Sequence, residues 1–269
     1  MIGTTEGRTI LEARELSRRF GGVVALQDYT LDLREGDLLG LIGPNGAGKT
    51  TAFNLLSGVL RPSAGVIRFA GREVTGWPTH RIARLGIART FQNVRLFGDL
   101  SVLDNVMAGL HARHGAGLLA TALALPSLRR RETRIAERAR AALEFVGLGG
   151  LADTRASDLA YGQQRLVEIA RAVATEPRVL LLDEPAAGMN PSETDALADL
   201  LRRLHGELGI ALLVVEHDMR LVMGVCRRIQ VLEGGRLLAE GRPEEIQNDP
   251  AVIAAYLGNR RGAEHAHPG

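Results

Sequence analysis

The sequence predicts an α/β fold with an inserted helical segment, and three observations support this prediction. Residues 37–42, 179–182 and 210–216 contain short apolar runs of strand length, as expected for strands that are covered on both faces. The first run is followed by a glycine-rich loop and then by an amphipathic segment at 50–56, which is the strand–loop–helix order of a parallel sheet. The long interval between the first two runs contains helical segments, so it is expected to form a module of its own.

The composition is ordinary for a soluble globular protein, since 45% of the 269 residues are hydrophobic and 24% are charged. The formal net charge of +2 is too small to indicate nucleic acid as the main partner. The single cysteine, Cys226, excludes an internal disulfide and favours a reducing compartment. Residues 1–8 lack the apolar core of a secretory signal, and the weakly polar stretch 115–125 is about half of the ~20 residues that span a bilayer. We therefore expect a soluble chain, which leaves docking onto a membrane protein open.

Lys49 is the only lysine of the chain, and the other 32 long basic side chains are arginines. It belongs to an unbroken phosphate-binding loop of the form G-x-x-x-x-G-K-[ST], which consists of Gly43, Pro44, Asn45, Gly46, Ala47, Gly48, Lys49, Thr50 and Thr51. An ammonium group is a compact point charge on a thin stem, whereas a guanidinium is a broad planar fork. Because only the ammonium fits inside a tight loop, we predict that Lys49 binds the β- and γ-phosphates of a nucleotide.

The residues on both sides of this loop support that prediction. Residues 37–42 are predicted to form a buried strand, and residues 50–56 a helix that ends at Ser57-Gly58. Backbone N–H groups of the loop and the positive end of the helix dipole then converge on the phosphates. Thr50 is expected to bind Mg²⁺ through its hydroxyl group, and Thr51 to make a further phosphate contact.

A second apolar run, residues 179–182, leads directly into Asp183 and Glu184. Two acids at the carboxyl end of a buried strand form the Walker-B arrangement. In it Asp183 holds Mg²⁺, and Glu184 polarises or deprotonates the attacking water. The alternative is that the two acids simply cap the strand; the phosphate-binding loop favours the catalytic interpretation.

A third apolar run, residues 210–216, places His217 at the carboxyl end of another strand. Ligands of open α/β sheets bind beside these strand ends, so His217 is a candidate sensor of the γ-phosphate. A histidine that caps a helix is the alternative.

Lys49 and Asp183 are 134 residues apart, which is a wide interval for a minimal phosphate-loop domain. The sequence between them predicts helices at residues 102–110, 118–125 and 127–145. Residues 129–140 of the last one contain two glutamates, Glu132 and Glu137, and six arginines, namely Arg129, Arg130, Arg131, Arg134, Arg138 and Arg140. A solvated helix face or a contact with an anionic protein is favoured over a nucleic-acid groove, which would have interleaved aromatic residues and a larger net charge.

The segment after these helices, Leu159, Ala160, Tyr161, Gly162 and Gln163, resembles the L-S-G-G-Q signature of ABC ATPases. With the phosphate loop, Gln92, Asp183-Glu184 and His217, it makes residues 8–258 resemble an ABC-type ATPase subunit. Phe20 falls where that family places an aromatic ring that stacks on adenine, and Glu233-Gly234-Gly235-Arg236 resembles the hairpin that follows the histidine.

The resemblance implies a P-loop NTPase core with an N-terminal antiparallel β region and an inserted helical subdomain. One ATP-binding domain, 8–258, is expected, with its core at 8–88 and 166–258, its helical and signature part at 89–165, and flexible tails at 1–7 and 259–269. The family also implies ATP and Mg²⁺ as ligands, with Gln92 joining Thr50 and Asp183 at the metal. Two subunits dimerise head to tail, so that the signature of each closes over the ATP of the other, and Gln92 couples this cycle to a membrane subunit.

The chain departs from the general family pattern at two places. Ala160 and Tyr161 stand where Ser-Gly is usual, and Asn190 stands where an aspartate follows Walker B, which we interpret as weaker phosphate contacts across the dimer. These departures and the helical insert make the chain similar to one ATPase subunit of bacterial branched-chain amino acid importers (the LivG type). Subunits of urea and lipopolysaccharide transporters are close relatives.

That similarity implies a peripheral ATPase on the cytoplasmic face of the inner membrane. Its partners would be two transmembrane permease subunits, a second and non-identical ATP-binding subunit and, indirectly, an external substrate-binding protein. A soluble ABC ATPase that acts on nucleic acid is the alternative of another class, but such proteins usually have two ATPase units or added inserts. A regulatory module without turnover is disfavoured, because Glu184 and His217 are both present.

Overall fold

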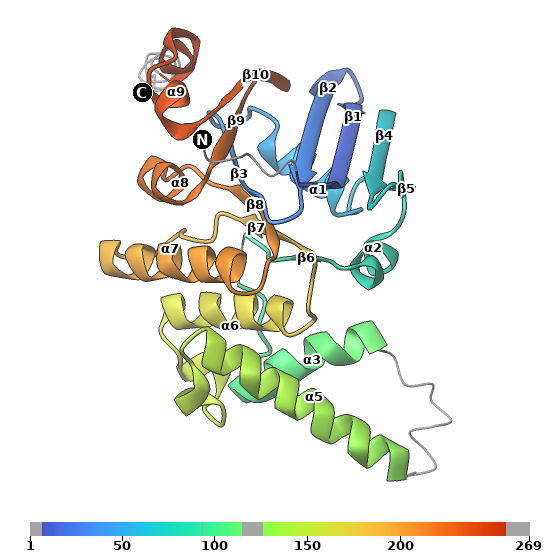
Figure 1. The fold of residues 1–269 in the computed structure, drawn as a ribbon, viewed down its shortest axis with the longest axis vertical. Helices are drawn as coiled ribbons and strands as arrows, with labels where there is room; N and C mark the ends of the chain where they lie inside the picture. The colour runs from blue at the N-terminus through green and yellow to red at the C-terminus, as the bar shows by residue number, and fades with distance from the viewer. Residues whose placement is uncertain (1–6, 93, 115–125, 257–269) are drawn as a thin grey trace, which may run out of the picture.

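The computed structural model of the protein describes residues 7–92, 94–114 and 126–256, and Figure 1 shows two sheets above a layer of helices. The predicted helix at 118–125 and nearly all of the two predicted tails lie outside these residues. Among the described residues, no helix is both long enough and apolar enough to cross a membrane.

The larger sheet has the strand order β10-β9-β3-β8-β7-β6. Its strands are β3 (Leu38–Ile42), β6 (Ile87–Arg89), β7 (Val179–Asp183), β8 (Ala211–Val215), β9 (Arg228–Glu233) and β10 (Arg236–Gly241). All neighbours are parallel except β10, which pairs antiparallel with β9 through the predicted hairpin. Every residue of β3, β7 and β8 is buried, which explains why these strands are continuous apolar runs without alternation. The three strands predicted from the sequence are therefore confirmed.

The smaller sheet is antiparallel and has the order β2-β1-β4-β5. It consists of β1 (Thr9–Phe20), β2 (Val23–Arg34), β4 (Ala64–Phe69) and β5 (Arg72–Glu73). Helix α1 (Lys49–Leu56) packs between β2 of this sheet and strands β7 and β8 of the larger one. Its buried side chains, such as Phe53 and Leu56, share one apolar core with Leu39 and Leu41 of β3.

The opposite face of the parallel sheet is covered by a second apolar core, to which Leu38 and Ile42 of β3 contribute. Around it lie α3 (Val102–His114), α5 (Pro126–Phe145), α6 (Tyr161–Val173), α7 (Pro191–Gly206) and α8 (Met219–Val225). Helices α3, α5 and α6 pack on one another and form the lower part of the molecule in Figure 1. The remaining short elements are α2 (Thr79–Leu85), η1 (Gly149–Leu151), η2 (Ala156–Asp158), α9 (Pro243–Gln247) and a helical stretch at 250–256.

Helix α5 is amphipathic in the way that its arginines predict. Ile135, Ala139 and Leu143 are buried against the other helices, whereas Arg134 and Arg138 are exposed. The charged side of this helix is thus a solvated face.

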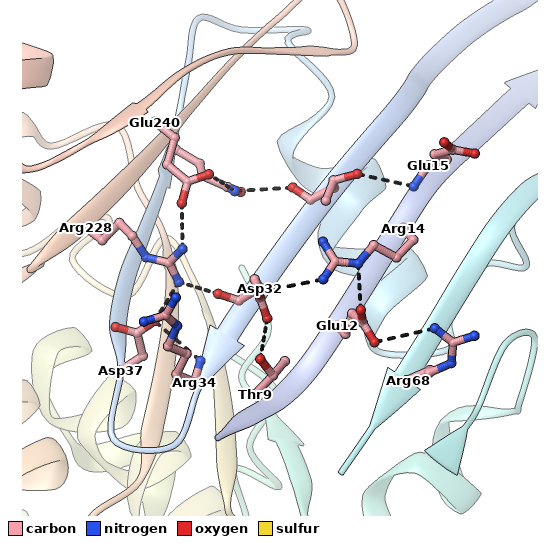
Figure 2. Close-up of polar contacts among 12 residues, drawn as sticks. Thr9, Glu12, Arg14, Glu15, Asp32, Arg34, Asp37, Arg68, Arg228 and Glu240 are labelled. Carbon is pink, nitrogen blue, oxygen red and sulfur yellow. Dashed lines mark hydrogen bonds and ion pairs between the residues drawn. The ribbon is translucent and has the colours of Figure 1, made fainter. Parts of the chain in front are cut away.

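An ion-pair network ties the two sheets together beside the hairpin of β9 and β10 (Figure 2). The guanidinium of Arg228 on β9 lies 2.6 Å from the carboxylate of Asp37 and 2.6 Å from that of Glu240 on β10. It also donates to the backbone carbonyl of Asp32 on β2. Strand β2 is thereby fixed against β9, and at the turn of the same hairpin Gln27 of β2 donates its N–H to the carbonyl of Gly235 at 2.7 Å.

Candidate nucleotide-binding site

The loop between β3 and α1 has a backbone that only glycine adopts without strain. Gly43, Gly46 and Gly48 all have positive φ angles, of 148°, 79° and 103°. A Cβ atom on Gly43 would lie 2.1 Å from the carbonyl oxygen of Leu232, and one on Gly48 would lie 2.7 Å from that of Ala25. The backbones of β9 and β2 therefore leave no space for side chains at Gly43 and Gly48 on the inner side of the loop. On its outer side Asn45, Gly46 and Thr50 are exposed.

Lys49 lies inside this loop, with only 7% of its surface exposed. Its Nζ donates to the carbonyls of Gly43, at 2.7 Å, and Pro44, at 3.0 Å. Burial lowers the pKa of this amine, while the carboxylates of Glu184 and Asp183 act in the opposite direction. An arginine fork is too broad for a position that is enclosed by two carbonyls of the loop, which agrees with the choice of lysine here.

Asp183 is the last residue of β7 and only 5% of its surface is exposed. Burial raises the pKa of this carboxyl group to about 6, although the nearby Arg89 guanidinium lowers it. Burial outweighs the effect of Arg89, so a bound cation would stabilise the ionised form of this carboxylate. Oxygen atoms are the ligands that Mg²⁺ prefers. Asp183 and the exposed hydroxyl-bearing Thr50 are the residues that fit the expected metal.

Glu184 follows Asp183 with a φ angle of 46°, which is unusual for a residue other than glycine. Its N–H donates to the carbonyl of Val215 at 2.8 Å, so the turn is fixed to β8. The carboxylate accepts a hydrogen bond of 3.0 Å from Nε2 of Gln92, and its other oxygen lies 3.7 Å from Nδ1 of His217. The structure thus brings together three of the predicted residues from three distant segments.

Glu216, just before His217, is a site residue to which the sequence analysis assigned no role. Its side chain is fully buried and accepts the backbone N–H groups of Ala186, at 2.8 Å, His217, at 3.0 Å, and Asp218, at 3.2 Å. Burial raises the pKa of this carboxyl group, and the three N–H donors lower it. Glu216 holds the segment after Glu184 and the segment of His217 at a fixed distance. An acid that ends an apolar strand was the only signal for it in the sequence.

The signature-like segment opens α6, as predicted, in the helical layer. Leu159 is buried, and the side chain of Gln163 accepts the N–H of Ala160 at 3.2 Å. Because α6 belongs to the core on the opposite face of the parallel sheet from α1, the segment lies in a different layer from the helix of the phosphate loop. The action of this segment on the nucleotide of a second subunit stays a prediction.

Two other predicted positions have local explanations in the structure. Asn190 caps α7: its side chain accepts the N–H of Glu193 at 3.0 Å, and the Glu193 side chain accepts that of Asn190 at 2.9 Å. Phe20 ends β1 and is 43% exposed, and the guanidinium carbon of Arg18 lies 4.7 Å from the centroid of its ring. Its stacking on adenine stays a prediction.

Comparisons with known proteins show which family the chain belongs to. The model of the ABC transporter family matches residues 26–187, and that of the branched-chain amino acid ATP-binding cassette transporter matches residues 236–261. The high-affinity branched-chain amino acid transport ATP-binding protein LivG of Salmonella typhimurium is 47% identical, over 93% of this chain and 98% of its own length. The lipopolysaccharide export system ATP-binding protein LptB of Acidithiobacillus ferridurans is 37% identical over the same shares.

A solved structure gives the same result for the fold. The crystal structure of an ATP-binding cassette of an ABC transporter in its ADP conformation superposes with a TM-score of 0.82 at 31% identity, over 93% of this chain and 99% of that one. The family match, the relatives and the site residues together establish that this chain belongs to the ABC transporter family, as one of its ATP-binding subunits.

Proposed function

We propose that this chain hydrolyses ATP to power the uptake of branched-chain, hydrophobic amino acids through an ABC importer. The observation that supports turnover is the position of Glu184, whose carboxylate lies between Gln92 and His217 and follows directly on Asp183. The choice of substrate rests on the similarity to LivG, at 47% identity, and on the match of residues 236–261 to the branched-chain model.

In this proposal each residue of the site has a defined role, and Gln92 has two. The loop N–H groups and Lys49 bind the phosphates of ATP, and Thr50, Gln92 and Asp183 hold Mg²⁺, which neutralises charge on those phosphates when it is bound. Glu184 accepts the proton of the attacking water, and the amide of Gln92 orients its carboxylate. His217 lies on the other side of Glu184, where its imidazole is available to the γ-phosphate.

The proposed dimer uses Leu159 to Gln163 on the ATP of a second, non-identical ATP-binding subunit. The N-terminal end of α6 would present backbone N–H groups and a positive dipole end to the γ-phosphate of that partner. Ala160 has no hydroxyl to add, so binding there would depend on the backbone and on Tyr161 and Gly162.

A groove of about 500 Å³ between the core and the helices is the proposed docking place of a permease subunit. Its lining is mainly apolar, with Phe91, Phe97 and Ile82 among the contributors, and Arg95 and Arg171 add positive charge. Phe91 lines the groove and is adjacent to Gln92, so a permease segment in the groove would lie close to the residue that contacts Glu184. Two permeases, the second ATPase and, indirectly, an external binding protein would complete the transporter, in which this chain is peripheral on the cytoplasmic face of the inner membrane.

Reconstitution in vesicles tests this proposal. The complex that copurifies with a tagged copy of this chain is expected to take up radiolabelled leucine, isoleucine and valine, and its ATP turnover should rise with the loaded binding protein. Glu184→Gln should abolish uptake while the complex stays assembled, and Asp99→Asn, on an exposed turn, is the matched control. Stimulation by urea or lipopolysaccharide in place of these amino acids would assign the chain to a related transporter. Copurification with ribosomes or nucleic acid would refute the transporter altogether.

A further inference from the structure

The aromatic ring of Tyr161 packs against the loop that follows the catalytic glutamate. Gly188 is four residues after Glu184 and has a φ angle of 78°. A Cβ atom on Gly188 would lie only 2.9 Å from Cε1 of Tyr161 and 3.3 Å from its Cδ1. Tyr161 and Gly188 are thus a matched pair, in which the missing side chain of one makes room for the ring of the other.

The neighbouring signature residue touches the same segment. A Cβ atom on Gly162 would lie 2.7 Å from Oε1 of Glu193, whose other oxygen accepts the N–H of Asn190. The beginning of α6 therefore contacts residues 188–193 at two adjacent points. These contacts join the signature segment to residues 188–193, which follow Glu184 in the sequence.

A second set of contacts joins the same helix to the other side of Glu184. Arg165 is one turn after Tyr161 and its side chain is 3% exposed, with the guanidinium carbon 5.5 Å from the centroid of the tyrosine ring. Its Nη1 donates to the carbonyl of Phe91 at 2.6 Å, and its Nη2 donates to that of Gln92. The side chain of Gln92 in turn donates to the carboxylate of Glu184 at 3.0 Å.

These contacts form a closed circuit that begins and ends at Glu184. From its backbone the circuit runs through Gly188 to Tyr161, then through Arg165 and Gln92 back to its carboxylate. Glu184 needs such support, since its φ angle of 46° is a conformation that surrounding contacts must hold in place. We infer that Tyr161 and Arg165 are positioning residues for Glu184 of their own subunit, in addition to any contact of the signature with the partner's ATP.

This inference rests on the proposed function and adds a consequence to it. A signature that closes on the partner's nucleotide shifts Tyr161, and the circuit passes that shift to Glu184 in the same chain. Closure of one ATP site would then change the position of the catalytic glutamate in the other site through the ring of Tyr161. A glycine at position 161 has no ring and could not pass on this shift.

Substitutions of Tyr161 and Arg165 test the two parts of this circuit. Tyr161→Gly removes the ring, and we expect kcat at Glu184 to fall by ~10- to 100-fold with KM for ATP changed less than about threefold, because a displaced base costs rate rather than binding. Tyr161→Phe keeps the ring and should restore most of that loss. Arg165→Lys keeps the charge but loses the fork that binds two carbonyls, so its kcat should also fall.

A double-mutant cycle tests the pair directly. Gly188→Ala places a Cβ atom against the tyrosine ring. Its effect on kcat should be smaller when Tyr161→Gly is also present than in the otherwise native chain. Additive effects on kcat would contradict a direct contact between the two positions. Thermal melts of every variant separate a folding defect from a displaced base, since only the latter leaves the melting temperature and the KM close to native values.

The decisive experiment separates action in the same subunit from action on the partner. The assembled transporter is prepared in two forms, one with the Walker-B glutamate of the partner ATPase changed to Gln and one with Glu184→Gln in this chain. Tyr161→Gly is added to this chain in both, and ATP turnover is measured. We expect at least a fivefold greater loss in the first form, where only Glu184 turns over. An equal or greater loss in the second form would overturn the inference, whereas absence of turnover in the native complex would refute the proposed function instead.

Discussion

Asp183, the proposed Mg²⁺ ligand, is expected to destabilise the folded chain at neutral pH, and this cost can be measured. Burial at the end of β7 raises its pKa from 3.8 to about 6, so the folded chain binds a proton at this group more tightly than the unfolded chain does. The contribution of Asp183 to stability is therefore fully present below pH 3.8 and is lost as the pH rises through 6. Replacing it by Asn, which stays neutral, should stabilise the folded chain at neutral and alkaline pH when nucleotide and Mg²⁺ are absent.

The size of the effect follows from the two pKa values. At about 1.4 kcal/mol per pH unit, the difference between 3.8 and about 6 corresponds to about 3 kcal/mol near pH 8. Near pH 5 the unfolded group is already largely ionised and the folded group is mostly protonated, so about half of that difference remains. Asp183→Asn should thus raise the free energy of unfolding by about 3 kcal/mol near pH 8 and by about half as much near pH 5.

Urea denaturation at the two pH values, with chelator present, measures both numbers. Asp99→Asn is the control, because Asp99 lies exposed in a turn and should change stability little at either pH. Mg²⁺ with ATP should stabilise the native chain and leave Asp183→Asn almost unchanged. The reasoning would be refuted by a variant that is no more stable than the native chain near pH 8, or whose gain does not shrink near pH 5.

Four further predictions concern the nucleotide site and the helical layer. Glu184→Gln should bind ATP but lower its turnover by ~10²–10⁴, and a rate above about a tenth of native would show that Glu184 is not the base. Lys49→Arg should fail to bind nucleotide in a calorimeter, because its fork does not fit between the carbonyls of Gly43 and Pro44; native affinity would contradict this. Helix α5 should give no submicromolar affinity for DNA or RNA near 150 mM salt, a result checked against a variant with its arginines changed to glutamine. Ala160→Ser should raise the apparent ATP affinity of the partner site by no more than about tenfold, since one neutral hydrogen bond contributes ~0.5–1.5 kcal/mol; a larger gain would mean that the serine does more than donate one bond.

The sequence was sufficient for the parts of the site that depend on local patterns. Strands β3, β7 and β8 were predictable because a strand covered on both faces leaves an unbroken apolar run. Lys49 and its glycines were predictable because the loop obtains its shape from residues that are adjacent in sequence. The antiparallel sheet of β1 and β2 came only from the family resemblance, since its long strands have an irregular register.

The contacts that orient Glu184 could not be predicted, because they join residues far apart in the chain. Arg165 binds the carbonyl of Phe91, 74 positions earlier, and no local pattern marks either partner. Glu216 likewise bonds to Ala186, 30 positions earlier. For Asn190 the sequence suggested a weaker phosphate contact across the dimer, which stays a prediction, and the structure adds that this residue caps α7.

The solitary lysine also gives this protein an unusual chemical property. Reagents that modify amines have one side-chain target in the whole chain, and that target is enclosed in the phosphate loop with a pKa lowered by burial. The arginines on the remaining surface do not react with them, so the α-amino group is the one other amine. Because Lys49 is proposed to bind the phosphates, carbamylation or acetylation of its amine is expected to block nucleotide binding. A chain that has no other lysine therefore limits side-chain damage of this kind to the residue on which the proposed nucleotide site depends.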